Sequence, residues 1–266
     1  LTDENRVVSK DVDFIKLNSS LSDFKIYGPN VNMKINEMSF LDHRGIFVKN
    51  LSSQFSYTKK QIRLEKLELA TNESSLKAEV VLNYKIEDFK NFNDKVNFDV
   101  QLEPSLIGSN DIRCFYSGLG KNQLFDTKAK INGTLNNLRL TKLKLSNSKT
   151  TQIIGDIHFI NLFGKENQKF YMKGKFKKFS STYDNLVNLL PELLDNKLPK
   201  NIKKLGVFSL TGNTQITAKA IDANFGMTSD VGFLKSKLKM KGIDFIDKAS
   251  FAEISVTFIF SSSFAL

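Results

Sequence analysis

The sequence predicts a mainly β fold with a few amphipathic helices. The first observation behind this prediction is that apolar and polar residues alternate with a period of two over many short segments, which is typical of strands with one apolar face. The second is that a strand-turn-strand pattern occurs twice, with a helix-like segment after each copy. Together they predict a repeating β-groove, which is a curled, elongated antiparallel sheet with an apolar concave face.

The clearest repeat is a short pattern of leucines and charged residues. Residues 62–69 read IRLEKLEL, and residues 138–145, which follow 76 positions later, read LRLTKLKL. A second shared segment comes after each copy, at residues 76–82 and 153–159. Because one copy cannot bury its apolar face alone, we expect the copies to stack end to end along the sheet.

The alternation slips once inside each copy. Leu64 and Leu67 lie three residues apart, as do Leu140 and Leu143, so a regular strand would place the two leucines on opposite faces. A β-bulge or a tight bend between them would restore the facing and increase the twist of the sheet. Since both copies slip at the same place, the sequence predicts a bent sheet rather than a flat one.

Further alternating segments predict most of the remaining strands. Asn, Ser, Gly and Asp residues separate them, and these residues favour the turns of an antiparallel meander. The segments are residues 31–36, 76–86, 96–102, 129–135, 170–176, 208–210, 216–220 and 233–240. We interpret residues 1–250 as one repeating segment of a longer protein, and residues 251–266 as an unassigned apolar tail at which that protein is truncated.

Two segments break the strand rhythm and predict helical elements near residues 109–119 and 181–205. Ser and Thr residues at the start of the second segment can cap a helix, and Asp184 lies in its first turn. The apolar residues of this segment have helical spacing, at Leu186, Leu189, Leu190, Leu193 and Leu194.

Proline and glycine residues set the limits of these helical elements. Pro191 should kink or end the first helix of the second segment, and Gly206 should stop a further turn or two over residues 199–205. The two helical segments align with an offset of 74 residues. We therefore expect units of about 75 residues, each with several strands and one amphipathic helix.

The net charge of +11 suggests an acidic partner, but its arrangement argues against nucleic acid. The lysines alternate with apolar residues, as in residues 142–145 and 235–241, which places them on the solvent face of the sheet. We therefore expect a solvated polar face and no nucleic-acid partner. Attraction to anionic lipid head groups is the second interpretation of the same lysines.

Few residues are suited to catalysis, and we expect no enzyme, no metal and no cofactor. His43 and His158 are the only histidines and fit strand or turn positions, while Cys114 fits a small buried apolar residue on a helix. No cysteine and histidine cluster has the spacing of a metal site. No apolar run is long enough to cross a membrane as a helix.

Several short motifs resemble those of a known family. They lie at residues 66–74, 94–100, 133–138, 188–191 and 242–244. In this order they resemble the AsmA/TamB-like group, most closely the TamB-type translocation and assembly module proteins of Bacteroidetes bacteria. The resemblance covers roughly residues 25–250 and rests on the order of the motifs rather than on one of them.

The resemblance implies a periplasmic protein of a Gram-negative bacterium that is anchored in the inner membrane. Such proteins form a bridge that conducts phospholipid along an apolar groove between the two membranes and supports outer-membrane protein assembly. The implied partners are phospholipid acyl chains, the membrane through a missing N-terminal anchor, and an outer-membrane β-barrel partner, TamA or a relative, through a missing C-terminal part.

The apolar positions of the predicted strands are candidates for the lining of the groove. A uniform lining would bind acyl chains and still let them slide, because no single position holds them uniquely. The same alternation is typical of a closed sandwich core, and a chaperone or scaffold that pairs with unfolded strands is an alternative function. The candidates are Leu64, Leu67, Leu69, Leu76, Val80, Leu82, Val96, Phe98, Val100, Ile131, Leu138, Leu140, Leu143 and Leu145.

Overall fold

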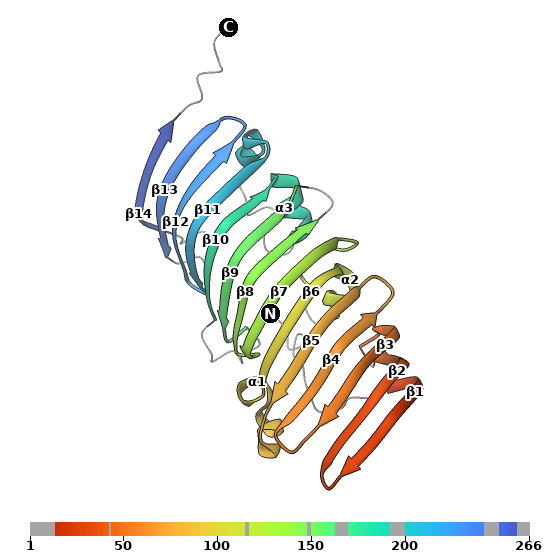
Figure 1. Ribbon diagram of the computed structural model, residues 1–266. Coiled ribbons are helices and arrows are strands. Elements are labelled where there is room, and N and C mark those ends of the chain that lie inside the picture. Colours follow the sequence, from red (N-terminus) through yellow and green to blue (C-terminus); the bar gives the residue numbers. More distant parts are fainter. Residues whose placement is uncertain are drawn as a thin grey trace.

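The computed structural model describes residues 14–42, 44–114, 117–147, 150–162, 170–191, 200–241 and 250–259. These residues form one fourteen-stranded antiparallel sheet, in which the spatial order of the strands is their order in the chain (Figure 1). The bowed strands stack into a long, twisted sheet that is open, with β1 and β14 as its two edges. The predicted fold class, mainly β with few helices, is confirmed.

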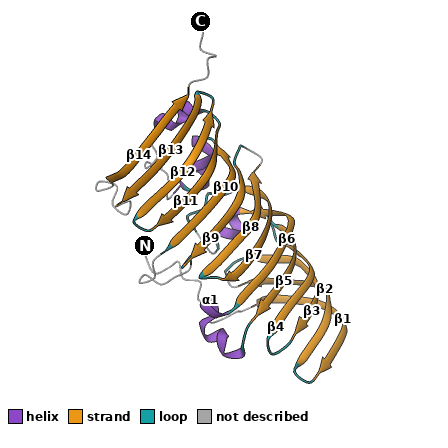
Figure 2. Ribbon diagram, turned by 60° about the vertical axis from the view of Figure 1, so that its left-hand side comes forward, coloured by secondary structure: helices purple, strands orange, loops and turns teal. Residues whose placement is uncertain are grey.

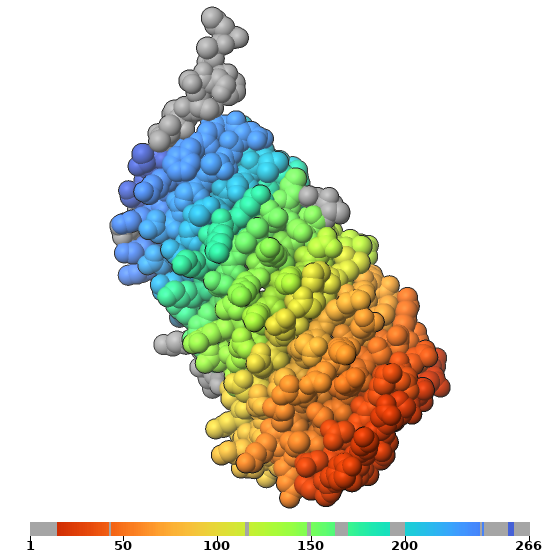
Figure 3. Space-filling model, in the orientation of Figure 1, coloured from red at the N-terminus to blue at the C-terminus, as the bar shows by residue number. Residues whose placement is uncertain are grey.

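The strands are long, and every neighbouring pair is antiparallel. Figure 3 shows the consequence, since the colour bands follow one another along the molecule from red to blue. The strands are β1 (Phe14–Tyr27), β2 (Asn30–Asp42), β3 (Phe47–Tyr57), β4 (Gln61–Ala70), β5 (Ser75–Asn83), β6 (Asn97–Gly108), β7 (Leu124–Thr134), β8 (Asn137–Asn147), β9 (Gln152–Ile160), β10 (Tyr171–Ser181), β11 (Phe208–Thr217), β12 (Ala220–Ser229), β13 (Gly232–Lys241) and β14 (Ser250–Ile259).

The helices are short and lie in the connections at the ends of the strands. The 3₁₀ helix η2 (Ile86–Asn91) and α1 (Phe92–Lys95) connect β5 to β6 at one rim of the sheet (Figure 2). At the opposite rim, α2 (Ser109–Arg113) connects β6 to β7, while α3 (Tyr183–Leu189) and the 3₁₀ helix η3 (Lys200–Leu205) lie between β10 and β11.

The elements recur with a regular spacing. Strands β4 and β8 begin 76 residues apart, at Gln61 and Asn137, and α2 and α3 begin 74 residues apart, at Ser109 and Tyr183. In both stretches, three strands precede the helix and a fourth strand follows it. The repeat in the sequence therefore corresponds to a repeat in the order of the elements.

The predicted bulge is present in both copies of the repeated motif. The register of β4 against β5 shifts between Leu64 and Leu67, and the register of β8 against β9 shifts between Leu140 and Leu143. The extra residue keeps both leucines of each pair on the same face of the sheet and adds local twist.

A carboxylate on the next strand holds each bulge. Lys66 and Lys142 have left-handed backbone conformations, with φ values of 51° and 53°. The Lys66 N–H donates to Oε1 of Glu79 at 3.0 Å, and the Lys142 N–H donates to Oδ1 of Asp156 at 2.9 Å. The bulge thus leaves a backbone donor outside the ladder, and an acidic side chain at the equivalent position accepts its hydrogen bond in both copies.

The predicted limits of α3 and η3 are confirmed. The side chain of Thr182 caps α3 by accepting from the N–H of Asn185 at 3.2 Å, and the helix ends at Leu189, before Pro191. The helix η3 ends at Leu205, and Gly206 follows with a φ of 62°, a conformation that glycine adopts without steric cost.

Six elements did not stand out in the sequence, namely β1, β3, β12, β14, η2 and α1. The predicted segment 216–220 covers the end of β11 and the turn that leads into β12, so β12 itself was missed. In β1 and β3, bulges interrupt the alternation, as at Lys16 and Asp23, whose φ values are 56° and 53°. The helices η2 and α1 are too short to show a period. Strand β14 lies in the segment that the sequence left unassigned. His43, Leu193, Leu194 and residues 242–244 lie outside the described residues.

Candidate functional site

One row of apolar side chains crosses the middle of the sheet. Each member lies directly opposite the next on the neighbouring antiparallel strand, so all members share one face. We call this set the central row; its members on β3–β9 are Phe55, Leu64, Val80, Val100, Ile131, Leu140 and Ile157. On β10–β14 the row continues through Gly174, Thr214, Ala223, Leu238 and Ile254.

A second row runs beside the central row on the same face, which we call the apolar face. It lies nearer the rim that carries α1 and consists almost entirely of large apolar side chains. Its members are Tyr57, Ile62, Leu82, Phe98, Gly133, Leu138, Phe159, Met172, Ile216, Ile221 and Met240. Two adjacent rows make the apolar face continuous across the sheet rather than a set of separate patches.

The structure places most of the predicted lining residues on this face. Five of them belong to the central row and three, Leu82, Phe98 and Leu138, to the second row. Leu69 pairs with Leu76 on the other side of the central row. Eleven of the fourteen predicted residues are half-buried, and the other three are buried. The described strands form a single sheet, and no second sheet covers this face among them.

The three buried residues have structural positions. Leu67 and Leu143, which are 8% and 4% exposed, follow the two bulges and face the small residues Ala78 and Gly155. Val96 is 0% exposed and lies between α1 and β6, where its N–H donates to the carbonyl of Phe92. These three side chains hold the bulges and the rim together rather than forming an accessible surface.

Aromatic residues close the rim near α1. Tyr84 contacts Phe89 at a ring-centroid distance of 4.6 Å, and Phe92 contacts Phe98 of the second row at 5.8 Å. Burial raises the pKa of Tyr84, whose hydroxyl donates to the carbonyl of Thr58 at 2.8 Å. The short helix α1 therefore covers one end of the apolar face and leaves the central row to the strands themselves.

Polar networks attach α2 and α3 to the sheet, and the sequence alone did not indicate them. In the first unit, the hydroxyls of Thr71 and Ser74 both donate to Oδ2 of Asp111 at 2.5 Å. In the second, the amide of Asn185 donates to Oγ1 of Thr150 at 2.7 Å. Both networks join a turn between paired strands to the first turn of a helix, so they have a structural role.

The opposite face of the sheet, which we call the polar face, carries most of the charges. One row of it pairs Asp99, Asn132, Arg139, His158 and Lys173 on five successive strands. The Asn132 amide donates to Oδ1 of Asp99 at 2.8 Å. Because adjacent residues of a strand alternate between faces, each apolar residue of the central row has polar neighbours in sequence.

A pocket of about 560 Å³ lies over β6–β9. Lys144 is directly opposite both Lys128 and Ile154, which places the pocket on the polar face. Its lining is mixed, with Pro104, Ser105, Leu106, Asp126, Thr127, Lys128, Lys144, Leu145, Ser146, Gln152 and Ile154.

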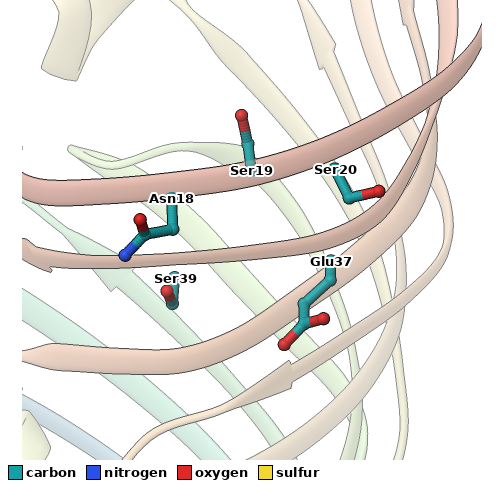
Figure 4. Close-up of a pocket in the computed structure, with 5 residues that line it drawn as sticks. All are labelled: Asn18, Ser19, Ser20, Glu37 and Ser39. Carbon is teal, nitrogen blue, oxygen red and sulfur yellow. The ribbon is translucent and has the colours of Figure 1, made fainter.

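A smaller pocket of about 200 Å³ lies between β1 and β2. It is lined by Asn18, Ser19, Ser20, Glu37 and Ser39, all of which are exposed or half-buried. In Figure 4 these side chains point in different directions and do not converge on one point. This shallow site offers a few hydrogen-bonding groups and no enclosed surface.

The residues with catalytic side chains are not grouped. Nε2 of His158 is 2.7 Å from Oδ1 of Asn137, and burial together with the charges of Arg139 and Lys173 lowers the His158 pKa. Cys114 is exposed, so the prediction that it is a buried apolar residue is wrong. Partial burial of its thiol and the charge of Asp111 raise its pKa. Within the described part of the chain, no three His, Cys, Asp or Glu residues are placed to hold a metal ion.

None of the helices that the structure describes is both long and apolar enough to cross a membrane. No protein-family model, no curated protein and no solved structure matches the chain. The apolar face is thus the surface on which a functional interpretation of this chain has to rest.

Proposed function

We propose that the apolar face lines a groove that binds phospholipid acyl chains and conducts them along the sheet. The observation that carries the proposal is the unbroken central row, which crosses from β3 to β9 with apolar side chains only. These side chains are half-buried, whereas a packed core would bury them. The bowing of the strands supports a concave arrangement (Figure 1).

The chemistry of the central row suits a ligand that moves. Each methylene that leaves water for the apolar face gains up to about 0.8 kcal/mol. Leu, Val and Ile contribute similar surfaces at successive strands, so an acyl chain can shift by one strand spacing with little change in free energy. A phosphate head group would remain at a rim, where it stays in contact with water.

In the wider proposal, this sheet is part of a periplasmic bridge between the inner and outer membranes. The supports are the motif resemblance to TamB-type proteins and the regular recurrence of strands and helices along the chain. An anchor in the inner membrane, an outer-membrane assembly partner such as TamA, and a role in outer-membrane protein assembly belong to this proposal.

The test is a binding assay with a fluorescent phospholipid and the purified chain. Ile131→Asp places a charge in the central row, and we expect at least about a tenfold loss of bound lipid, because a charge in an acyl environment costs about 2.5–3.5 kcal/mol. The matched control is Thr141→Asp, which adds the same charge on the polar face of the neighbouring strand, directly opposite Lys130.

The two variants separate lipid binding from general effects of charge. Lipid binding should be lost in the first variant and kept in the second, with equal thermal unfolding of the folded proteins. Ile131→Asn, which carries no charge, covers the case in which the aspartate prevents folding. Unchanged lipid binding by a folded central-row variant would refute the proposal.

A second candidate function is a scaffold that pairs with unfolded strands. The observation that favours it is the long edge strand β1, in which Ile15, Leu17, Phe24 and Ile26 are each more than half exposed. An edge strand offers free backbone groups to an added strand. Introducing Pro at Ser19 or Ser22 of β1 would block strand addition without touching the central row. Loss of peptide binding with intact lipid binding would favour the scaffold function for this edge.

A further inference from the structure

The charges of the sheet are divided unequally between its two halves. Strands β2–β6 carry five basic and seven acidic residues, whereas strands β7–β13 carry thirteen basic and three acidic residues. The net charge of the whole chain is +11, so nearly all of the excess lies on the second half. Solubility alone gives no reason to gather the excess on one end of the sheet.

The strand register places these cations on one face. Lys128 is directly opposite Lys144, and Lys144 is followed on the next strands by Ile154 and Lys178. Lys175 on β10 lies opposite Asn213, Asn213 lies opposite Asn224, and Asn224 lies opposite Lys237 on β13. These four residues therefore share one face. Like charges directly opposite each other destabilise a sheet, so this arrangement has a cost that the fold itself does not require.

Few of these cations are neutralised by neighbours. In the first half of the sheet, Lys77 pairs with Glu68 at 2.9 Å and Arg63 with Glu65 at 3.4 Å. On β7–β10, Lys128 pairs with Glu103 at 2.9 Å. By contrast, Lys130, Lys144, Lys175 and Lys237 are exposed, and none of them has an ion pair within 4.0 Å among the residues that the structure describes.

Two independent features show what this face favours. The charges of Arg139 and Lys173, on either side of His158, add to burial in lowering its pKa, which indicates a positive local potential. The pocket of about 560 Å³ is lined by Lys128, Lys144 and Asp126 together with the apolar Leu106, Ile154 and Pro104. Positive charge beside an apolar surface suits an anionic amphiphile.

We propose that the polar face of β7–β13 is a docking surface for the head groups of a bilayer that contains anionic phospholipid. The ammonium groups are compact point charges on long flexible side chains, and they bind phosphates without a fixed geometry. Lys and Arg residues near an anionic membrane surface each contribute about 1 kcal/mol to binding. The sheet would then lie against the membrane with its polar face and keep its apolar face free.

Nucleic acid is the competing polyanion, and the residues of this face fit it less well. Recognition of single strands uses aromatic side chains on which bases stack. The phenylalanines at Phe98, Phe159 and Phe225 are instead on the apolar face, by their pairing with apolar partners or glycine. Arg139 is the single arginine on β7–β13.

The test compares partition of the chain into phosphatidylcholine vesicles with and without phosphatidylglycerol. The variant replaces Lys130, Lys144, Lys175 and Lys237 by Gln, and we expect its preference for the anionic vesicles to fall at least about tenfold. The matched control replaces Lys34, Lys49, Lys59 and Lys60 by Gln, which gives the same change in net charge on the first half of the sheet. The preference of this control should stay within about twofold of the original chain, and salt should weaken binding.

The outcomes distinguish this proposal from acyl-chain binding by the other face. The variant should keep its binding of the fluorescent phospholipid, because the central row is unchanged. Equal losses in the variant and the control would mean that net charge alone matters and would overturn the docking surface. A variant that loses binding to double-stranded DNA but keeps its preference for anionic vesicles would assign the face to nucleic acid and overturn it as well.

Discussion

Single residues with unusual backbone conformations shape this sheet. Lys66 and Lys142 take left-handed conformations at equivalent bulges, and Glu79 and Asp156 accept the N–H groups that the bulges release. The sequence shows the bulge only as a slip between two leucines. Without the bulges, one leucine of each pair would turn to the polar face, and the apolar face would be interrupted.

The first prediction concerns the strain at Lys142. A left-handed conformation costs a side-chain-bearing residue about 1–2 kcal/mol, and glycine does not have this cost. Lys142→Gly should therefore leave the free energy of unfolding within about 0.5 kcal/mol of the original chain, since the gain offsets the entropy that glycine loses. Lys144→Gly, two residues away in regular strand, should lower it by about 1 kcal/mol. Equal losses in a denaturant titration would contradict this account of the bulge.

The second prediction concerns pH. The pKa of His158 is lowered in the folded chain, so His158 contributes stability fully above its unfolded pKa of about 6.5 and loses it as the pH falls. His158→Gln removes the titrating group and keeps a hydrogen-bond donor for Asn137. The stability difference between the original chain and the variant should fall as the pH drops from about 7 to about 5. A flat difference, or one that rises on acidification, would show that the positive surroundings do not act on this residue.

At the scale of the element, close approach between strands decides which residues are tolerated. Gly155 takes the place in the second unit that Ala78 has in the first. A Cβ atom at Gly155 would lie 2.2 Å from the carbonyl oxygen of Lys175, whereas one at Gly226 would lie 3.5 Å from the ring of Phe233. The backbone of β10 therefore leaves no room for a side chain at Gly155, whereas a methyl group fits at Gly226.

The third prediction follows from this difference. Gly155→Ala should lower the free energy of unfolding by about 1–3 kcal/mol, because β9 and β10 have to move apart. Gly226→Ala should be neutral or stabilising by up to about 1 kcal/mol, because it restricts the unfolded chain without a clash. Thermal unfolding of both variants measures the contrast. Similar melting temperatures for the two would be inconsistent with the tight approach of β9 to β10.

The fourth prediction concerns the start of α3. Thr182→Ala removes the side-chain acceptor for the N–H of Asn185 and should cost about 1 kcal/mol, whereas Thr182→Ser keeps the acceptor and should cost much less. Chemical denaturation compares the two variants. If the alanine and serine variants were equally stable, the cap would have no energetic role.

Elements with many regularly spaced apolar residues were predictable from the sequence, and elements that depend on a few contacts were not. Alternation indicated β4 to β9, and Leu spacing with Pro191 and Gly206 indicated α3 and η3. The interrupted alternation of β1 concealed it, because each bulge reverses the facing. Val96 continues the alternation of β6 in the sequence, but in the structure it lies between α1 and β6 and is buried there, which the alternation does not indicate.

At the scale of the whole molecule, the register of fourteen strands joins local alternation into two extended surfaces. One is the apolar face with its central row, and the other is the polar face, whose cations gather on β7–β13. A one-residue error of register at any strand would turn the apolar side chains of that strand to the polar face. The repeated bulges and their carboxylate partners keep the register from one unit to the next.

The most direct measurement is photo-crosslinking of bound phospholipid at single positions, read by mass spectrometry. A photoreactive residue is placed at Val100, Ile131 or Leu140 of the central row, or one residue away on the polar face at Asp99, Asn132 or Arg139. Lipid adducts are expected at all three central-row positions, and few are expected at their neighbours. Adducts confined to the polar face, or absent from the central row in folded protein that is saturated with lipid, would contradict the proposed groove.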